Sequence, residues 1–132
     1  MKIRYVAAII FYDDKKRILL QDRRGISKFG NEWGFFGGGI EENETPEQAI
    51  IREAKEELDF DLKEFRYIGK YEGKINENIF ILHVFVSPLN DNLSKFKQKE
   101  GRGMKMFSLT EAEKLKQPEH NKRVIIDLKN VL

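Results

Sequence analysis

Residues 37–60 read GGGIEENETPEQAIIREAKEELDF, three glycines followed by a segment with the features of a helix. Thr45 suits the N-cap of this helix, Pro46 suits its first position, and Gln48 can close a capping box with Thr45. The pattern predicts a helix from Pro46 to about Leu58, which a glycine turn connects to the preceding chain.

The predicted helix carries two kinds of side chain. Its apolar stripe can face a core and consists of Ile50, Ile51, Ala54 and Leu58. Glu53, Glu56 and Glu57 share another side, because residues three and four apart are neighbours on a helix. Such like charges repel, and hard cations such as Mg²⁺ or Mn²⁺ would offset the repulsion by binding the carboxylates. The alternative is a solvated acidic face, which is common in a chain with 24 Lys+Arg and 22 Asp+Glu.

The whole pattern of this segment favours the metal site over the solvated face. Six identities carry the pattern: Gly38, Glu44, Arg52, Glu53, Glu56 and Glu57. They resemble the signature box of the Nudix hydrolases, enzymes that cleave nucleoside diphosphates linked to another moiety. At roughly 6% background each, such a match would arise by chance at about one position in ten million. The resemblance implies an α/β fold, the Nudix fold, with a mixed β-sheet sandwiched between α-helices and residues 1–132 as a single domain.

Three positions depart from the usual spelling of the family. Asn43 and Asp59 stand where glycine is common, and both residue types tolerate a left-handed backbone, so we expect the two turns to survive. Phe36 stands in place of proline, at the mouth of the expected site.

The resemblance also implies roles for individual residues. The expected metal ligands are the carbonyl of Gly37 and the side chains of Glu53, Glu56, Glu57 and Glu100. Arg52 is expected to orient Glu53 through a charge-assisted hydrogen bond, and Glu44 to fix the geometry of the loop and helix. The proton of the attacking water would pass to Glu53 or to Glu100. For Glu100 the alternative is an ordinary solvated loop residue.

Three further residues are expected to bind substrate. Phe35 matches an aromatic that lines the base pocket in the family, with plain core packing as the alternative. Asn121 matches an asparagine of MutT-type members that recognises a purine by paired hydrogen bonds, with an N-cap or surface role as the alternative. Arg23 begins a basic, glycine-containing loop over residues 23–32 that is placed to approach a substrate or is an ordinary connection. His83 fits a core or pocket-wall histidine better than a catalytic one.

The remaining elements follow from apolar periodicity. We expect strands over residues 3–12, 17–22, 33–36, 65–72, 78–87 and 104–109, with the first two forming a hairpin and the fourth and fifth joined around Gly73. The strand at 78–87 is apolar on both faces and should be central. Thr110 with Glu113 predicts the capping box of a short helix, and residues 119–132 predict a terminal helix.

Composition limits the class of protein. With no cysteine, disulfides and thiolate chemistry are excluded, and the net charge of +2 does not favour a nucleic-acid partner. No apolar run approaches about 18 residues, so we expect a soluble cytoplasmic protein without a membrane partner. The expected partner is a small-molecule nucleotide, and the expected state is a monomer or a homodimer.

The leading hypothesis is Mg²⁺-dependent hydrolysis of a nucleoside triphosphate, such as 8-oxo-dGTP, to the monophosphate and pyrophosphate. Alternatives with the same chemistry are nucleotide sugars, ADP-ribose, dinucleoside polyphosphates and capped RNA ends. Two alternatives of other classes are a catalytically silent, nucleotide-sensing Nudix module and a structural protein with an acidic helix.

Overall fold

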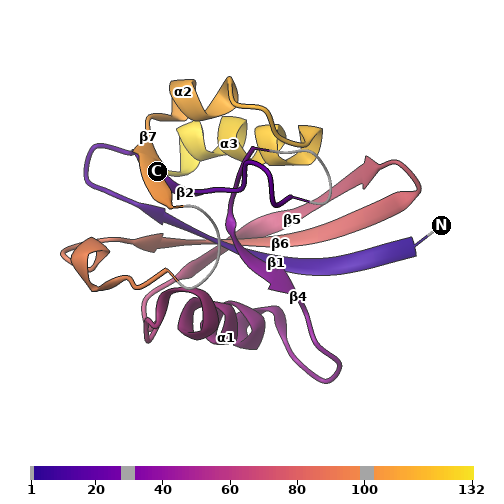
Figure 1. The fold of residues 1–132 in the computed structure, drawn as a ribbon, viewed down its shortest axis with the longest axis horizontal. Helices are drawn as coiled ribbons and strands as arrows, with labels where there is room; N and C mark the ends of the chain where they lie inside the picture. Colours follow the sequence, from indigo (N-terminus) through magenta and orange to yellow (C-terminus); the bar gives the residue numbers. More distant parts are fainter. Residues whose placement is uncertain (1, 28–31, 99–102) are drawn as a thin grey trace.

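The computed structural model describes residues 2–27, 32–98 and 103–132, and within these ranges seven strands form one mixed sheet with helices on both faces (Figure 1). The strands are β1 (Lys2–Tyr12), β2 (Ile18–Asp22), β3 (Trp33–Gly34), β4 (Phe36–Gly39), β5 (Arg66–Ile75), β6 (Asn78–Pro88) and β7 (Met104–Phe107). The helices are α1 (Pro46–Leu58), α2 (Leu109–Glu113), α3 (Glu119–Val131) and a short 3-10 helix, η1 (Leu93–Lys95). This architecture confirms the predicted α/β sandwich.

The sheet has the order β3-β2-β1-β6-β5, with β4 paired to β1 and β7 paired to β2. β1 runs parallel to the central strand β6 along its whole length and antiparallel to β2, so the predicted hairpin and the predicted central strand are both confirmed. β4 is antiparallel to β1, with Gly38 opposite Ala7 and Gly37 opposite Ala8. The glycines therefore form a strand in the middle of the fold, where the sequence predicted a turn.

Alternate residues of β1 pack in two separate hydrophobic cores, because successive side chains of a strand point to opposite faces. Ala7, Ile9 and Phe11 pack on the face covered by α1. Ala8 and Ile10 pack on the opposite face, which is covered by α2 and α3 (Figure 1).

The buried face of α1 differs from the predicted stripe in one residue. Ile51 is 41% exposed, and Ala49 is buried in its place. Glu57, at 9% exposure, also lies on the buried side. The reason is rotational: each residue turns the helix by about 100°, so Glu57 lies between the directions of Ala49 and Leu58. The acidic and apolar sides of α1 therefore overlap.

The ends of α1 confirm the local predictions. Thr45 Oγ1 accepts a hydrogen bond from the Gln48 amide at 3.1 Å, and the Thr45 amide donates to Gln48 Oε1 at 2.9 Å. Asp59 caps the C-terminus in the left-handed region, with φ 53° and ψ 40°, and Asn43 has φ 66°. Both residues thus take the conformation that glycine would take at those positions.

Two predicted boundaries were wrong. The capping box of α2 is formed by Ser108 and Glu111, two residues before the predicted pair of Thr110 and Glu113, because β7 already stops at Phe107. Gly73 lies inside β5, and the turn to β6 falls at residues 76–77, where Asn76 has φ 55°. None of the helices in the described part of the chain combines the length and the apolarity needed to cross a membrane.

Candidate active site

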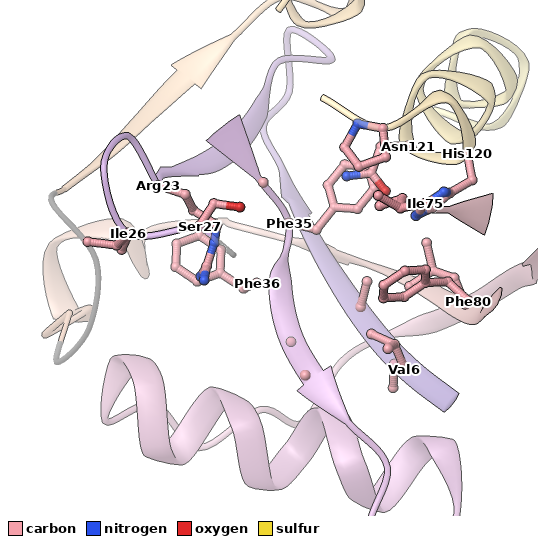
Figure 2. A pocket seen from close by; sticks show the side chains of 17 residues that line it. Val6, Arg23, Ile26, Ser27, Phe35, Phe36, Ile75, Phe80, His120 and Asn121 are labelled. Carbon is pink, nitrogen blue, oxygen red and sulfur yellow. The ribbon is translucent and has the colours of Figure 1, made fainter. Parts of the chain in front are cut away.

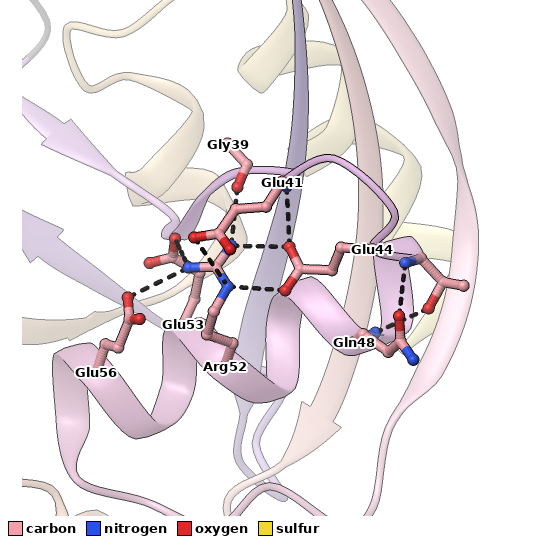
Figure 3. A network of polar contacts seen from close by, with 8 residues as sticks. Gly39, Glu41, Glu44, Gln48, Arg52, Glu53 and Glu56 are labelled. Atoms are coloured by element: carbon pink, nitrogen blue, oxygen red, sulfur yellow. Dashed lines mark hydrogen bonds and ion pairs between the residues drawn. The ribbon is translucent and has the colours of Figure 1, made fainter.

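Arg52 lies at the centre of a polar network between α1 and the loop that precedes it (Figure 3). Its Nε donates to Glu44 Oε2 at 2.7 Å and its Nη2 to Glu44 Oε1 at 2.9 Å. Its Nη1 donates to Glu53 Oε1 at 2.9 Å and to Glu56 Oε2 at 3.2 Å. Nη2 also donates to the carbonyl of Gly39 at 2.9 Å. One guanidinium thus connects the loop before the helix, strand β4 and two carboxylates of the helix.

The network fixes charge states as well as positions. The guanidinium of Arg52 donates to the Glu44 carboxylate and thereby lowers the pKa of Glu44 from 4.5 to about 2. The same hydrogen bond raises the pKa of Arg52. The Glu41 amide donates a further hydrogen bond to Glu44 Oε1 at 3.0 Å, which ties the turn before α1 to the same carboxylate. Both members of the pair are therefore charged at any pH near neutrality.

Strand β4 is shaped by close approaches that exclude side chains. A Cβ at position 38 would lie 2.6 Å from Glu53 Oε1, so the Glu53 carboxylate rests directly on Gly38. A Cβ at position 37 would collide with the Ala7 carbonyl of β1, and Gly37 has φ 134°. Only glycine permits β4 to lie this close to both β1 and the carboxylate of α1.

The candidate ligands fit a hard divalent cation in their chemistry. Glu53, Glu56 and Glu57 supply carboxylate oxygens, and Gly37 would supply a carbonyl oxygen, which are the donors that Mg²⁺ and Mn²⁺ prefer. Glu53 and Glu56 lie together on Arg52 Nη1. Across residues 2–27, 32–98 and 103–132, no three acidic or histidine side chains stand within common reach of one ion. Glu100, the fifth predicted ligand, lies outside the described residues.

A cavity of about 450 Å³ opens on the other side of β4 (Figure 2). All three residues predicted to bind substrate line it: Arg23, Phe35 and Asn121. Gly37 and Gly38 line it as well. Because the Glu53 carboxylate rests on Gly38, the cavity and the carboxylates of α1 are separated only by the glycine strand.

Phe35 and Phe36 face different environments. Phe36 is 1% exposed and packs edge to face on Phe11, with ring centroids 6.3 Å apart, in the core beneath α1. Phe35 is partly buried on the opposite face of the sheet, and Figure 2 shows its ring pointing toward Asn121. The substitution of proline by Phe36 therefore fills the core beneath α1.

Asn121 occupies the first turn of α3 and is 8% exposed. The backbone N–H of Asn121 donates to the carbonyl of Pro118 at 3.0 Å, and Pro118 is the N-cap of the helix. The alternative of an N-cap or surface asparagine is therefore wrong. The Asn121 side chain lines the cavity, and its carboxamide forms no hydrogen bond with any residue of the described ranges, which leaves its donor and its acceptor for a ligand.

The sequence did not predict that His120 lines the cavity. His120 is 6% exposed and stacks on Phe80, with ring centroids 5.6 Å apart and an interplanar angle of 19°. The available signal was the position of His120 next to Asn121 at the start of the terminal helix. His83, expected in the core or in a pocket wall, is not among the residues that line this cavity, and its Nδ1 is 3.1 Å from the hydroxyl of Tyr67.

The sequence has relatives among characterised proteins. The family model of the NUDIX domain matches residues 1–128. The CTP pyrophosphohydrolase of Escherichia coli (strain K12) is 36% identical over 86 residues, which cover 65% of this chain and 62% of that protein. The 8-oxo-dGTP diphosphatase of Proteus vulgaris is 40% identical over 58 residues, which cover 44% of this chain and 52% of that protein. The matched region thus spans little more than half the length of these relatives.

Solved structures extend the likeness to the whole fold. The solution structure of the E. coli ORF135 protein has a TM-score of 0.80 and 26% identity, covering 99% of this chain and 91% of that one. The MutT protein from Methanosarcina mazei Go1 has a TM-score of 0.82 at 17% identity, covering 98% and 95%, and at that identity the likeness concerns the fold. Because the family model matches nearly its full length, this chain, with its mixed sheet and the carboxylates of α1, belongs to the Nudix family as a MutT-like member.

Proposed function

We propose that this protein is a pyrophosphohydrolase that uses Mg²⁺ or Mn²⁺ to cleave a nucleoside triphosphate to the monophosphate and pyrophosphate. The observation that carries the proposal is the contact between Gly38 and Glu53: the cavity that would hold a base ends where the carboxylates of α1 begin. A nucleotide whose base lies between Phe35 and Asn121 would extend its phosphates across the glycines of β4 toward the carboxylates of α1. An oxidised purine, as in 8-oxo-dGTP, is the leading substrate.

The metal would be held by oxygen donors of α1, β4 and the later loop: Glu53, Glu56, Glu57, the Gly37 carbonyl and Glu100. When bound, such an ion neutralises phosphate charge and makes a coordinated water more acidic. The chain itself supplies orientation. Arg52 holds the Glu53 carboxylate from one side while Gly38 supports it from the other. Glu44 holds Arg52, and a proton from the attacking water would pass to Glu53 or Glu100.

The base would be recognised at the end of the cavity away from Gly38 and the carboxylates of α1. Phe35 offers an aromatic face for stacking. Asn121, with its free donor and acceptor, can pair with an adjacent N–H and C=O, the arrangement that an oxidised guanine presents at its altered edge. Arg23 lines the cavity on the opposite side from α3 and would supply a positive charge to the nucleotide (Figure 2).

A pyrimidine triphosphate is the second candidate. It is favoured by the similarity to the CTP pyrophosphohydrolase, which covers more of this chain than the similarity to the 8-oxo-dGTP diphosphatase. Both candidates require the same phosphate chemistry and differ only in what occupies the cavity.

A substrate panel tests the proposal. 8-oxo-dGTP, dGTP, CTP, ADP-ribose and a nucleotide sugar are incubated with the protein and Mg²⁺ at mildly alkaline pH, and phosphate products are measured, with Glu57→Gln as the control. Preferred cleavage of 8-oxo-dGTP that is lost in the control supports the leading substrate. Cleavage of CTP supports the second candidate, and cleavage of only ADP-ribose or a sugar nucleotide contradicts the triphosphate proposal. Tight nucleotide binding without turnover of any substrate would instead identify a sensor.

A further inference from the structure

His120 occupies a position in the cavity to which the proposed function assigns no role. The imidazole stacks on Phe80 of β6 and rests against Gly73 of β5, where any side chain would collide with the ring. It belongs to the same helical turn as Asn121, and both side chains line the cavity (Figure 2). Three elements, α3, β5 and β6, therefore hold this ring in one place.

The ring is buried without a polar partner among the described residues. It is only 6% exposed, and within residues 2–27, 32–98 and 103–132 its nitrogens take part in no hydrogen bond. Neither ring nitrogen is among the fully buried atoms that lack a partner, so each keeps some accessible surface, and His120 lines the cavity. A ligand that fills the cavity and displaces water would therefore have to supply the missing hydrogen-bond partner. The other histidine of the chain, His83, behaves in the ordinary way, since Tyr67 partners it.

The surroundings of His120 keep the ring neutral near pH 7. Burial, and then the positive charge of Arg123 on α3, lower the pKa of His120. Tyr71 of β5 and Arg4 of β1 lie on the same face of the sheet as His120. The Tyr71 hydroxyl donates a hydrogen bond to Asp127, and Arg4 is paired with Phe80 in the register of β1 and β6. Among the described residues that line the cavity no carboxylate is present, and Arg23 carries the positive charge. A neutral imidazole has one donor and one acceptor nitrogen to offer.

We propose that His120 is a specificity-determining residue that makes one hydrogen bond to the base edge, beside the bonds made by Asn121. The proposal rests on the proposed function, because it assumes that the base occupies this cavity. A base that completes the bond is preferred over one that leaves the buried imidazole unpaired, since an unsatisfied buried group costs more than the bond itself contributes.

The first test compares kcat/KM for 8-oxo-dGTP and dGTP, and for CTP and dGTP, because in each ratio the phosphate and metal contributions cancel. In His120→Phe the aromatic stack on Phe80 remains while both nitrogens are lost. We expect the kcat/KM ratio for the preferred base to fall about tenfold, which corresponds to the loss of one hydrogen bond. His83→Phe is the matched control and should keep the wild-type ratio.

The pH dependence of the ratio separates recognition from packing. In the wild type, protonation removes the acceptor of His120, and because burial lowers the pKa of His120, the ratio should change as the pH falls below about 6.5. His120→Gln keeps a neutral donor and acceptor without a titration, and should keep most of the ratio while losing this change. If His120→Phe does not fold, as judged by circular dichroism, a wild-type pH profile in His120→Gln overturns the proposal.

Calorimetric binding of 8-oxo-dGMP, dGMP and CMP without metal provides a readout independent of turnover. A wild-type preference that His120→Phe lowers about tenfold supports the proposal even if no triphosphate is hydrolysed, in which case the proposed function alone fails. A folded His120→Phe whose preferences stay within about twofold of the wild type, in binding and in turnover, overturns the role of His120 while leaving the hydrolase intact.

Discussion

Arg52 donates two hydrogen bonds to the Glu44 carboxylate, from Nε to Oε2 at 2.7 Å and from Nη2 to Oε1 at 2.9 Å. A bidentate pair fixes the plane of the guanidinium as well as its position. The remaining nitrogen, Nη1, is thereby directed to Glu53 at 2.9 Å. The placement of a candidate metal ligand on α1 thus depends on a residue in the preceding loop.

This pair should make stability depend on pH in a defined window. Because the pKa of Glu44 is about 2 in the folded protein and 4.5 ordinarily, its stabilising effect is present above about pH 4.5 and disappears as the pH falls toward about 2. In thermal melts, the Tm difference between wild type and Glu44→Gln should be constant above that window and shrink within it. Glu113→Gln, which removes an exposed ion pair with Lys129, is the control and should give a smaller difference. A Tm difference for Glu44→Gln that does not vary with pH would contradict this assignment.

Arg52→Lys should impair catalysis although the charge is kept. A single ammonium cannot reach Glu44, Glu53 and the Gly39 carbonyl together, whereas the planar guanidinium does. We expect kcat to fall roughly 10- to 100-fold, as for other residues that orient metal ligands. Steady-state kinetics with a cleaved triphosphate measures this, and a change confined to KM would show that Arg52 acts in substrate binding instead.

Glu53→Gln and Glu57→Gln should each lower kcat by roughly 100-fold or more, because each removes a negative charge that the proposed metal site requires. Without metal, both variants should be as stable as the wild type or slightly more so, since a repulsion between carboxylates is relieved. Titration with Mn²⁺ followed by electron paramagnetic resonance should show weaker binding. Glu42→Gln, on the exposed loop before α1, is the matched control. Near-normal activity in both active-site variants would remove the basis for the metal site.

Gly38→Ala should displace the Glu53 carboxylate without unfolding the protein. The new Cβ would lie 2.6 Å from Glu53 Oε1, and the end of a side chain can move where backbone cannot. A shift of about 1 Å in a catalytic group can cost on the order of 100-fold in kcat. Gly39→Ala has no atom within 4 Å of the new Cβ and should keep wild-type activity. Equal activities of the two variants, both folded by circular dichroism, would show that Glu53 does not need its observed position.

Local rules were sufficient for the two ends of α1. The capping box of Thr45 and Gln48 and the left-handed residues Asn43 and Asp59 involve partners within a few positions, so their chemistry is visible in the sequence. Errors arose where periodicity was ambiguous: Ile51 sits at the margin of the apolar stripe, and Gly73 has the composition of a turn but lies inside β5.

The sequence by itself determined which chemical groups this protein possesses, the class of its fold and the helix that carries Glu53, Glu56 and Glu57. Only the tertiary structure decided which groups meet. Phe35 and Asn121 share a cavity because β4 pairs with β1 and α3 packs over the same face of the sheet, and Gly73 makes room for His120 across the same layer. The reason is that helix caps and periodicity act over a few residues, whereas a cavity is defined by strand order and by the space that absent side chains leave between distant segments.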